Sequence, residues 1–496
     1  MNYPFWDIPY LGSGWVIGII AIFHVMISQF AVGGGLYLPL AERKAQRMTD
    51  PAMREAWLSQ LVSYSKFFLI LTGVFGTVSG VGIWFAIGLT HPEATSTLIH
   101  NFVFGWAIEW VFFLVELATA AVYYYTWNRI DEKLHLTVGW VYAGASVCTL
   151  IIINGILSFM LTPGDTWLAV AGTGHEASKF WNAFFNPTYW PSLFLRCCVC
   201  ASLAGVWALI SASRIDGDKQ PALKSSLVKW SVKWLVPSFV AMPFLMIWYY
   251  MMVPASQQAL LTLGIDTINA GTFSTVTRMA LVIIVTSATI VGVAYYLAYR
   301  SPVDFNLSHA MAVLLLALIA TGAGEYSREM LRKPYVIGHW MYSNGVRVPY
   351  VARINQEGYL AHSMWVWNNR ICAPGLDGDL QFLTAESYMA YYKCTFDDKP
   401  TTSYSRGEAI FRGECGSCHT LGGYRPLKSL LAGRDRANIG NFITMLHDYK
   451  ADSPYTRFMP PMVGTKQDID DLANYLNAKV NPPAPAAQKP VQTAQK

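Results

Sequence analysis

Residues 15–40 read WVIGIIAIFHVMISQFAVGGGLYLPL, a continuous apolar stretch that contains one ionisable residue, His24. A helix needs about 20 mostly apolar residues to cross the hydrocarbon core of a bilayer. The stretch is longer than the apolar core of a signal peptide; no basic segment precedes it and no small-residue cleavage site follows it. We therefore interpret it as a retained membrane-spanning helix, and this helix decides the class of fold.

The rest of the chain has a matching composition. It is 53% hydrophobic and 14% charged, which is too apolar for one ordinary soluble domain. Apolar stretches of sufficient length predict about eight spans, at residues 15–40, 63–89, 102–126, 136–161, 189–212, 233–253, 275–299 and 310–325. The expected fold is mainly α, a polytopic transmembrane helix bundle in a lipid membrane, followed by a small all-α domain.

The loops predict the orientation of this bundle. Basic residues gather in every second loop: Arg43, Lys44, Arg47, Arg54, Arg129, Lys133, Arg214, Lys219, Lys224 and Lys229. The loops at 90–101 and 254–274 contain no Lys or Arg, and the loop at 162–188 contains only Lys179. Because loops on the inner side are enriched in Lys and Arg, both termini are expected outside. Everything after about residue 326 then lies on the outer side.

The part of the chain beyond the last span divides into three. Residues 341–403 form a connecting segment, residues 404–480 a compact domain, and residues 481–496 a Pro/Ala/Gln-rich tail that cannot build a core. Cys372 and Cys394 lie in an oxidising compartment in this arrangement, so they either form a disulfide or remain two thiols.

The compact domain contains Cys415-Gly416-Ser417-Cys418-His419. This spacing lets the thiols of Cys415 and Cys418 add to the two vinyl groups of a haem while the imidazole of His419 reaches the iron. A zinc site would need a second pair of Cys or His ligands at metal spacing, and the sequence offers none nearby. The motif therefore predicts covalently attached haem c.

The surroundings of this motif resemble a class I cytochrome c domain. RGEAIFRGE before it reads as a short helix; Met459-Pro460-Pro461 follows; and an apolar stripe at helical spacing comes last, at Ile469, Leu472, Tyr475 and Leu476. The resemblance implies that His419 is the proximal iron ligand and Met459 the distal one, with Met462 as the alternative. His/Met ligation raises the reduction potential, which suits a domain that passes single electrons.

Ionisable residues inside the predicted spans form a second group of candidates. His24 lies in the first span, Glu109 and Glu116 in the third, and Glu329 just after the eighth. With the expected topology, His24, Glu109 and Glu329 converge on the outer third of the membrane, while Glu116 lies deeper. Ionisable side chains are costly in hydrocarbon and usually functional, so these residues are expected to hold haem iron or carry protons toward it.

Residues 1–340 resemble the large subunit of cytochrome bd-type oxidases. The resemblance rests on IIAIFHVMISQF and GGGLYLPLAE, SGVGIWFAIG, FGWAIEWVFFLVE, IIINGILSFMLTP and EMLRKPYVIG, in this order. It implies that His24 is an axial ligand at the oxygen-reactive haem and that Glu109 lies beside or on that haem. It further implies that Glu329 ligates a high-spin haem b, that Glu116 belongs to the proton path, and that Arg332 pairs a haem propionate.

The chain also departs from this family. Where the family has the histidine of its low-spin haem b, this chain has Leu195 or Arg196, and Arg278-Met279 replaces the Arg-x-Met of the second ligand. Only ASQQALLTLGIDTINAGTFS joins the sixth and seventh spans, so the long outer loop that binds quinol in the family is missing. These departures suggest that the haem c provides the electron entrance on that side.

The expected function is that of a bd-like terminal oxidase subunit. Its own haem c would pass electrons from an extracytoplasmic donor, a cytochrome c or another donor, to membrane haems b and/or d that reduce dioxygen or nitric oxide. The alternatives are a quinol:cytochrome c oxidoreductase that exports electrons and a non-catalytic electron-transfer subunit. The resemblance implies a second bd-like membrane subunit and a bacterial inner membrane, with the cytochrome c domain on the periplasmic side. No nucleic-acid partner is expected.

Overall fold

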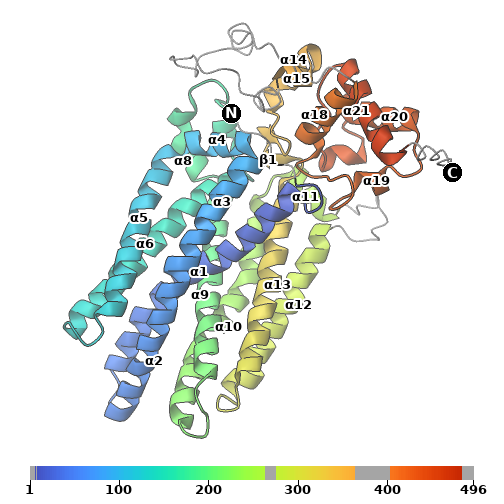
Figure 1. The fold of residues 1–496 in the computed structure, drawn as a ribbon. Helices are drawn as coiled ribbons and strands as arrows, with labels where there is room; N and C mark the ends of the chain where they lie inside the picture. Colours follow the sequence, from blue (N-terminus) through green and yellow to red (C-terminus); the bar gives the residue numbers. More distant parts are fainter. Residues whose placement is uncertain (1–5, 7, 263–274, 363–402, 483–496) are drawn as a thin grey trace, which may run out of the picture. The chain divides into compact units, whose positions relative to one another are not determined.

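The fold is that of a computed structural model, which describes residues 6, 8–262, 275–362 and 403–482 (Figure 1). Cys372 and Cys394, most of the loop between the sixth and seventh spans, and the C-terminal tail lie outside the described residues. The predicted disulfide therefore stays a prediction. Within the described part of the chain, the structure is helical apart from one two-stranded antiparallel sheet, β1 (Tyr335–Ile337) with β2 (Met341–Tyr342).

Eight long apolar helices are present among the described residues, which confirms the predicted number of spans. They are α1 (Ser13–Gln46), α2 with η1 and α3 (Pro51–Ile70, Leu71–Gly76 and Thr77–Thr90), α5 (Val103–Tyr125), α6 (Glu132–Phe159), α9 (Tyr189–Ser213), α10 (Pro221–Met252), α12 with η4 (Thr275–Val293 and Ala294–Tyr299) and α13 (Leu307–Arg332). They run alongside one another in Figure 1.

Shorter helices lie in the connections and in the C-terminal part. They are α4 (Pro92–Asn101), α7 (Asp165–Leu168), η2 (Glu176–Lys179), α8 (Phe180–Phe184), α11 (Ala255–Thr262), η5 (Val348–Tyr350), α14 (Val351–Glu357), α15 (Tyr359–His362), α18 (Ser403–Ile410), η7 (Phe411–Cys415), α19 (Leu427–Leu430), α20 (Arg436–Asp448), η8 (Pro454–Arg457) and α21 (Lys466–Val480).

The chain divides into two compact units. The membrane unit comprises residues 15–348 and 457–459, and the C-terminal unit comprises residues 1–14, 349–456 and 460–496. The helices α14 and α15, which the sequence assigns to the connecting segment, thus group with the C-terminal unit. Within that unit the backbone N–H of Tyr359 in α15 donates to Asp468 Oδ2 of α21 at 3.0 Å.

Helix α1 is longer than the apolar span predicted at residues 15–40, because it continues to Gln46 through a charged segment. One reason is a favourable position for Lys44, whose Nζ lies 4.2 Å from the ring centroid of Trp57 and 4.5 Å from that of Trp230. A cation held over aromatic faces is stabilised even where water is scarce, so the helix can carry its charge past the apolar stretch.

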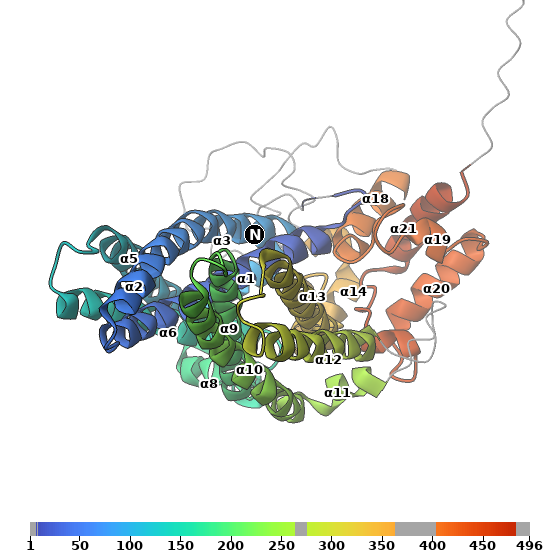
Figure 2. The same cartoon turned by 90° about the horizontal axis from the view of Figure 1, so that it is seen from below.

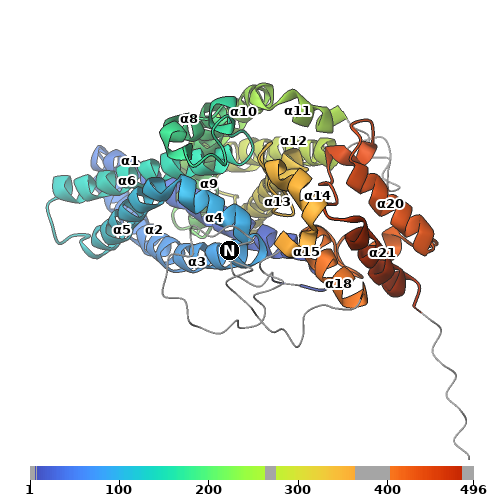
Figure 3. The same ribbon diagram turned by 90° about the horizontal axis from the view of Figure 1, so that it is seen from above.

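The membrane unit is built from helix pairs that are close in sequence. Helix α5 packs against α6, α9 against α10, and α12 against α13. Figures 2 and 3 show α5, α6 and α2 on one side of the membrane unit and α9, α10, α12 and α13 on the other. Helix α6 also packs on α9, and α9 on α13, which joins the two sides.

Three consecutive glycines let α1 approach its neighbours closely. A Cβ on Gly33 would collide with the backbone carbonyl of Cys200 in α9. A Cβ on Gly34 would lie 2.8 Å from the ring of Phe68 in α2, and one on Gly35 would collide with the ring of Tyr142 in α6. Small residues at helix interfaces are what permits such close backbone approach in a membrane. The GGG motif therefore fixes α1 against three other helices.

The C-terminal unit has its core on α21. The predicted apolar stripe is confirmed as buried, because Ile469, Leu472, Tyr475 and Leu476 are 7%, 1%, 2% and 3% exposed. The helix begins with a capping box in which the side chain of Thr465 accepts from the N–H of Asp468 and the Asp468 carboxylate accepts from the N–H of Thr465. Helices α18, α19 and α20 pack on α21, and α15 packs on α18.

We predict that Gly33→Ala destabilises the membrane unit, because the added methyl group meets backbone that cannot turn aside. Overpacking of this kind typically costs about 1–3 kcal/mol. Thermal unfolding of the purified protein in detergent measures the loss. Gly18→Ala is the matched control, since Gly18 lies on the same helix and a Cβ there meets nothing within 4 Å. Equal midpoints for the two variants would contradict the assigned packing of α1.

Candidate functional site

The Cys-x-x-Cys-His motif lies at the end of η7 in the C-terminal unit. The backbone N–H groups of Cys418 and His419 donate to the carbonyl of Cys415 at 3.1 Å and 2.9 Å. This single turn places both thiols and the imidazole on one short segment. Cys415 and Cys418 are each half-buried, and neither takes part in a disulfide. The local geometry suits two thioether bonds to one planar group.

The imidazole of His419 is oriented by the loop that follows. Its Nδ1 lies 3.0 Å from the carbonyl oxygen of Arg425. A carbonyl oxygen only accepts, so Nδ1 carries the hydrogen and the lone pair is on Nε2. A histidine that donates from one ring nitrogen and presents the other is the usual form of a metal ligand. These three residues therefore fit a covalently held haem.

The two candidate distal ligands fall in different units. Met462 is 5% exposed in the C-terminal unit, and its carbonyl oxygen lies 3.1 Å from Nδ1 of His447. Residues 457–459, which include Met459, group with the membrane unit. Met459 as the distal ligand stays a prediction, with Met462 as the alternative.

A buried carboxyl group lies directly before the motif, and sequence reasoning did not identify it. Glu414 is 7% exposed, and its Oε2 accepts from the backbone N–H of Val463 at 2.9 Å. Its Oε1 is buried without a hydrogen-bond partner in the described part of the chain. Burial raises the pKa of Glu414 well above its usual range, against a smaller lowering by the Val463 N–H. Burial therefore favours the neutral form of this carboxyl group.

The N-terminal segment packs against the loop after His419, which sequence reasoning also missed. The backbone N–H of Tyr424 donates to the carbonyl of Tyr10 at 2.9 Å. A Cβ on Gly423 would collide with the backbone of Tyr10, and Gly12, with a φ of +78°, faces Thr420 and Tyr424. The adjacent glycines Gly422 and Gly423 were a signal of close approach, but the sequence does not name the partner.

In the membrane unit, His24 on α1 faces Ser79 on α3. The Ser79 hydroxyl donates to the carbonyl oxygens of Phe75 at 2.6 Å and Gly76 at 3.1 Å, and His24 Nδ1 lies 3.0 Å from the same oxygen. With the hydroxyl hydrogen of Ser79 directed to the backbone, Ser79 accepts from His24 Nδ1, and in that tautomer the lone pair of His24 is on Nε2. A Cβ on Gly80 would lie 3.3 Å from His24 Cε1, so the SGVGIW motif supplies both the anchor and the space.

Glu109 and Glu116 lie on α5, seven residues apart and on one helix face. Glu116 is 8% exposed, and its Oε1 accepts from Thr149 Oγ1 of α6 at 2.5 Å. Glu109 is half-buried and has no hydrogen bond or ion pair within residues 8–262, 275–362 and 403–482. Glu116 is therefore buried in the bundle with a hydrogen-bond partner on α6. Glu109 lies seven residues, about two helical turns, nearer the N-terminal end of α5.

Glu329 lies in an ion-pair cluster at the end of α13. Its carboxylate pairs with Arg332 and with Nζ of Lys333, the latter at 3.0 Å. Arg332 also donates to the carbonyl of Val336 at 3.3 Å, while its Nε is buried without a partner in the described part of the chain. A carboxylate has about four lone-pair positions, so Glu329 can accept from these cations and still offer an oxygen to a metal. Arg332 retains a donor for a further anion.

The same cluster affects a histidine outside the spans. Burial lowers the pKa of His91 to about 4; nearby Glu329 raises it, while Lys333 and Arg332 lower it further. His91 is therefore neutral at physiological pH and adds no charge beside Glu329.

The residues at the departure from the family pattern lie on α9. The Nε of Arg196 is buried and has no partner in the described ranges, and the side chain is within electrostatic range of Arg328 and Glu325, which form an ion pair at 2.8 Å. Neither Leu195 nor Arg196 is a haem-iron ligand of the usual kind.

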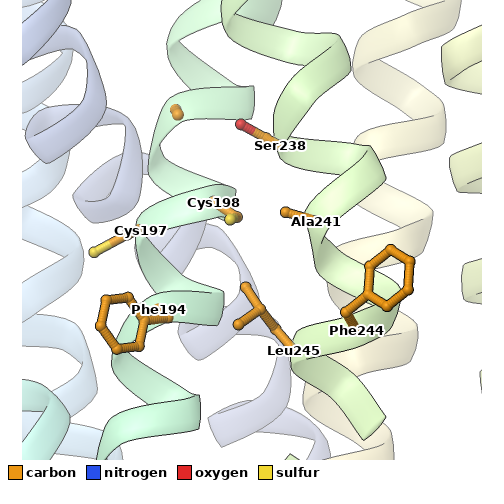
Figure 4. Close-up of a pocket in the computed structure, with 8 residues that line it drawn as sticks. Phe194, Cys197, Cys198, Ser238, Ala241, Phe244 and Leu245 are labelled. Carbon is orange, nitrogen blue, oxygen red and sulfur yellow. The ribbon is translucent and has the colours of Figure 1, made fainter. Parts of the chain in front are cut away.

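An apolar pocket of about 420 Å³ lies between α9 and α10 (Figure 4). Its lining is Phe194, Cys197, Cys198, Ala201, Ser238, Ala241, Phe244 and Leu245. No histidine or charged side chain lines this pocket. Among the described residues, no group of three or more His, Cys, Asp and Glu is placed to hold a bare metal ion. The candidate iron sites at His419, His24 and Glu329 therefore each provide only one or two protein ligands, and the ring nitrogens of a haem would provide the others.

Comparison with known proteins agrees with both halves of this description. Residues 13–249 match the family model of cytochrome bd terminal oxidase subunit I, and residues 404–478 match that of cytochrome c. No curated protein sequence matches the chain. The solved structure of the bd oxidase from Geobacillus thermodenitrificans matches with a TM-score of 0.54 and 17% sequence identity, covering 65% of this chain and 87% of that one. At this identity the likeness shows a shared fold.

We predict that Gly423→Ala releases the N-terminal segment from the loop after His419. The methyl group would displace the backbone of Tyr10 and break its hydrogen bond from Tyr424. A hydrogen bond contributes about 1 kcal/mol, so the amide of Tyr424 should exchange with deuterium roughly fivefold faster. Gly422→Ala is the control, because a Cβ on Gly422 meets nothing within 4 Å. Unchanged exchange in Gly423→Ala would show that this contact does not form.

Proposed function

We propose that this chain, which joins a cytochrome bd oxidase subunit I domain at residues 13–249 to a cytochrome c domain at residues 404–478, is the electron-accepting subunit of a respiratory terminal oxidase. Electrons enter through its own haem c and pass to haems b and/or d in the membrane unit. A soluble or membrane-bound cytochrome c, or another one-electron donor, supplies them from the outer side of a bacterial inner membrane. A second bd-like membrane subunit completes the enzyme.

The observation that carries this proposal is the matched state of His419 and His24. In each, Nδ1 is the nitrogen that is hydrogen-bonded to an oxygen of its own unit, the Arg425 carbonyl for His419 and the Ser79 hydroxyl for His24. This supports the proposal that Nε2 is the nitrogen that binds iron. One chain therefore contains two imidazoles that are oriented through Nδ1, one in a Cys-x-x-Cys-His motif and one inside the membrane unit.

The overall reaction is O₂ + 4 e⁻ + 4 H⁺ → 2 H₂O, and each of four reduced donors gives one electron. Haem bound at these sites supplies one-electron transfer and, where iron has an open position, dioxygen binding. The protein residues bind, orient and move protons. Cys415, Cys418 and His419 hold haem c; His24, Glu109 and Glu329 are the proposed ligands or neighbours of the membrane haems. Arg332 offers its buried Nε to a propionate.

Glu116 is the proposed proton carrier. It lies buried between α5 and α6, where it accepts a hydrogen bond from Thr149. A carboxyl group in this position holds a proton away from bulk water and releases it toward Glu109, which lies on the same face of α5. One proton then reaches the membrane haems for each electron that they receive, so that no net charge accumulates inside the membrane.

We predict that Cys415→Ala prevents stable covalent attachment of haem c while the membrane haems still assemble. The enzyme should then lose most of its oxygen consumption with a reduced cytochrome c donor, since the electron entrance is missing. Denaturing gels stained for covalent haem and an oxygen electrode measure the two effects. Normal turnover in this variant would contradict entry through haem c. Rapid reduction of haem c by quinol without oxygen uptake would favour the exporter instead.

We predict that His24→Ala alters or abolishes the reduced absorption spectrum and carbon monoxide binding of the membrane haems. Ser79→Ala should have a smaller effect in the same direction, because it removes only the acceptor that sets the tautomer of His24. His175→Ala is the control, since His175 is an exposed residue before η2. A wild-type spectrum and wild-type carbon monoxide binding in His24→Ala would rule out His24 as a ligand.

A further inference from the structure

The membrane unit contains a second buried ionisable group, at the opposite end of α1 from His24. Glu42 of α1, Tyr123 of α5 and His135 of α6 are 2%, 3% and 3% exposed. Glu42 Oε2 accepts from Tyr123 Oη at 2.7 Å, and Glu42 Oε1 lies 3.0 Å from His135 Nδ1. Gln46 Nε2 donates to the same Oε1 at 3.0 Å. None of these side chains has a role in the function proposed above.

The geometry fixes how many protons this inner cluster (Glu42, Tyr123 and His135) holds. His135 Nε2 lies 2.9 Å from the carbonyl oxygen of Tyr123, which only accepts, so Nε2 carries a hydrogen. The tyrosine hydrogen is used on Glu42 Oε2. One further proton is therefore shared between Glu42 Oε1 and His135 Nδ1, either as a carboxylate beside an imidazolium or as a carboxylic acid beside a neutral imidazole. The pair is built to hold one transferable proton.

Aromatic side chains around His135 hold its ring in place and do not compete for the proton that it shares with Glu42. The imidazole of His135 contacts the rings of Tyr123 and Trp127, with centroid distances of 4.3 Å and 4.1 Å, and these two rings also contact each other at 5.3 Å. Aromatic faces restrict the ring but accept no proton from either nitrogen. Three helices meet at the cluster, and each contributes one of its members.

A face of α6 leads from the inner cluster toward Glu116. His135, Tyr142, Ser146 and Thr149 follow one another at intervals of seven, four and three residues, which places them on one side of the helix. Tyr142 and Ser146 are 4% and 0% exposed, Tyr142 is within electrostatic range of Glu116, and Thr149 donates to Glu116. The Tyr142 and Ser146 hydroxyls donate to the backbone carbonyls of Ala31 and Ala143 at 3.2 Å and 3.0 Å, and the described side chains along this face do not hydrogen-bond to one another. Proton transfer along the face therefore requires these hydroxyls to rotate, since each can both accept and donate.

We propose that Glu42 and His135 form the inner terminus of a proton path that runs along this face of α6 to Glu116. A proton from the inner side binds the pair, and the pair passes its proton onward; no electron is exchanged in the step. The proposal rests on the proposed oxidase function, which consumes four protons per dioxygen. It also agrees with the basic residues near these helix ends, Arg43, Lys44 and Lys133, which the positive-inside rule assigns to the inner side.

The test uses the whole enzyme reconstituted in lipid vesicles and fed by reduced cytochrome c from outside. Glu42→Gln keeps the acceptor for Tyr123 but removes the transferable proton. It should slow oxygen consumption and proton uptake from the vesicle interior on the order of tenfold or more, with the haem spectrum unchanged. Glu42→Asp should recover part of the rate. Glu132→Gln is the matched control, because Glu132 is 61% exposed at the same end of α6, in an ion pair with Arg54.

A second readout does not depend on turnover. The infrared difference spectrum between oxidised and reduced enzyme should contain a carboxyl band that shifts in deuterated water, is missing in Glu42→Gln and persists in Glu132→Gln. Wild-type turnover and an unchanged infrared spectrum in Glu42→Gln would overturn the path and make the cluster a structural tether. No oxygen consumption by the wild-type enzyme would instead overturn the oxidase function, and the path with it.

Discussion

The close contact of α1 with its neighbours at Gly33, Gly34 and Gly35 is the constraint on which the membrane unit depends. It brings the backbone of α1 against Cys200 of α9 and its surface against Phe68 of α2 and Tyr142 of α6. The same helix carries His24 on one side of this contact and Glu42 on the other. A shift of α1 would therefore move a candidate iron ligand and a candidate proton carrier together. Small residues permit this close helix contact in the membrane, and the contact fixes the positions of His24 and Glu42 relative to the neighbouring helices.

The departures from the bd oxidase pattern share one feature, which is that the side chains at these positions of α9 are not ligands of the kind that usually bind haem iron. Leu195 and Arg196, at the position where the resemblance leads us to expect the low-spin haem ligand, offer no imidazole, and Arg196 is within electrostatic range of Arg328 and Glu325. The pocket between α9 and α10 has an apolar lining. The proposed electron entrance is therefore the domain at residues 404–478, which matches cytochrome c and contains the Cys-x-x-Cys-His motif for haem c.

The sequence predicted the parts that depend on local patterns. Eight spans follow from apolar length, and the stripe from Ile469 to Leu476 follows from helical spacing; both are present. The partners of the site residues could not be predicted in this way. Ser79 lies 55 positions from His24, and His135 lies 93 positions from Glu42. Such pairs form only when helices pack, and no local pattern encodes which serine or histidine faces which partner. The contact between Tyr10 and Tyr424 is another pair that is distant in sequence and has no local pattern to predict it.

The central claim is that one chain carries both a covalent haem c and the haems that react with dioxygen. A haem inventory of the purified chain by pyridine haemochrome spectra, taken before and after acid–acetone extraction, tests it most directly. The account predicts one haem c that remains with the protein and at least one haem b or d that is extracted. A chain that contains haem c alone would contradict the account.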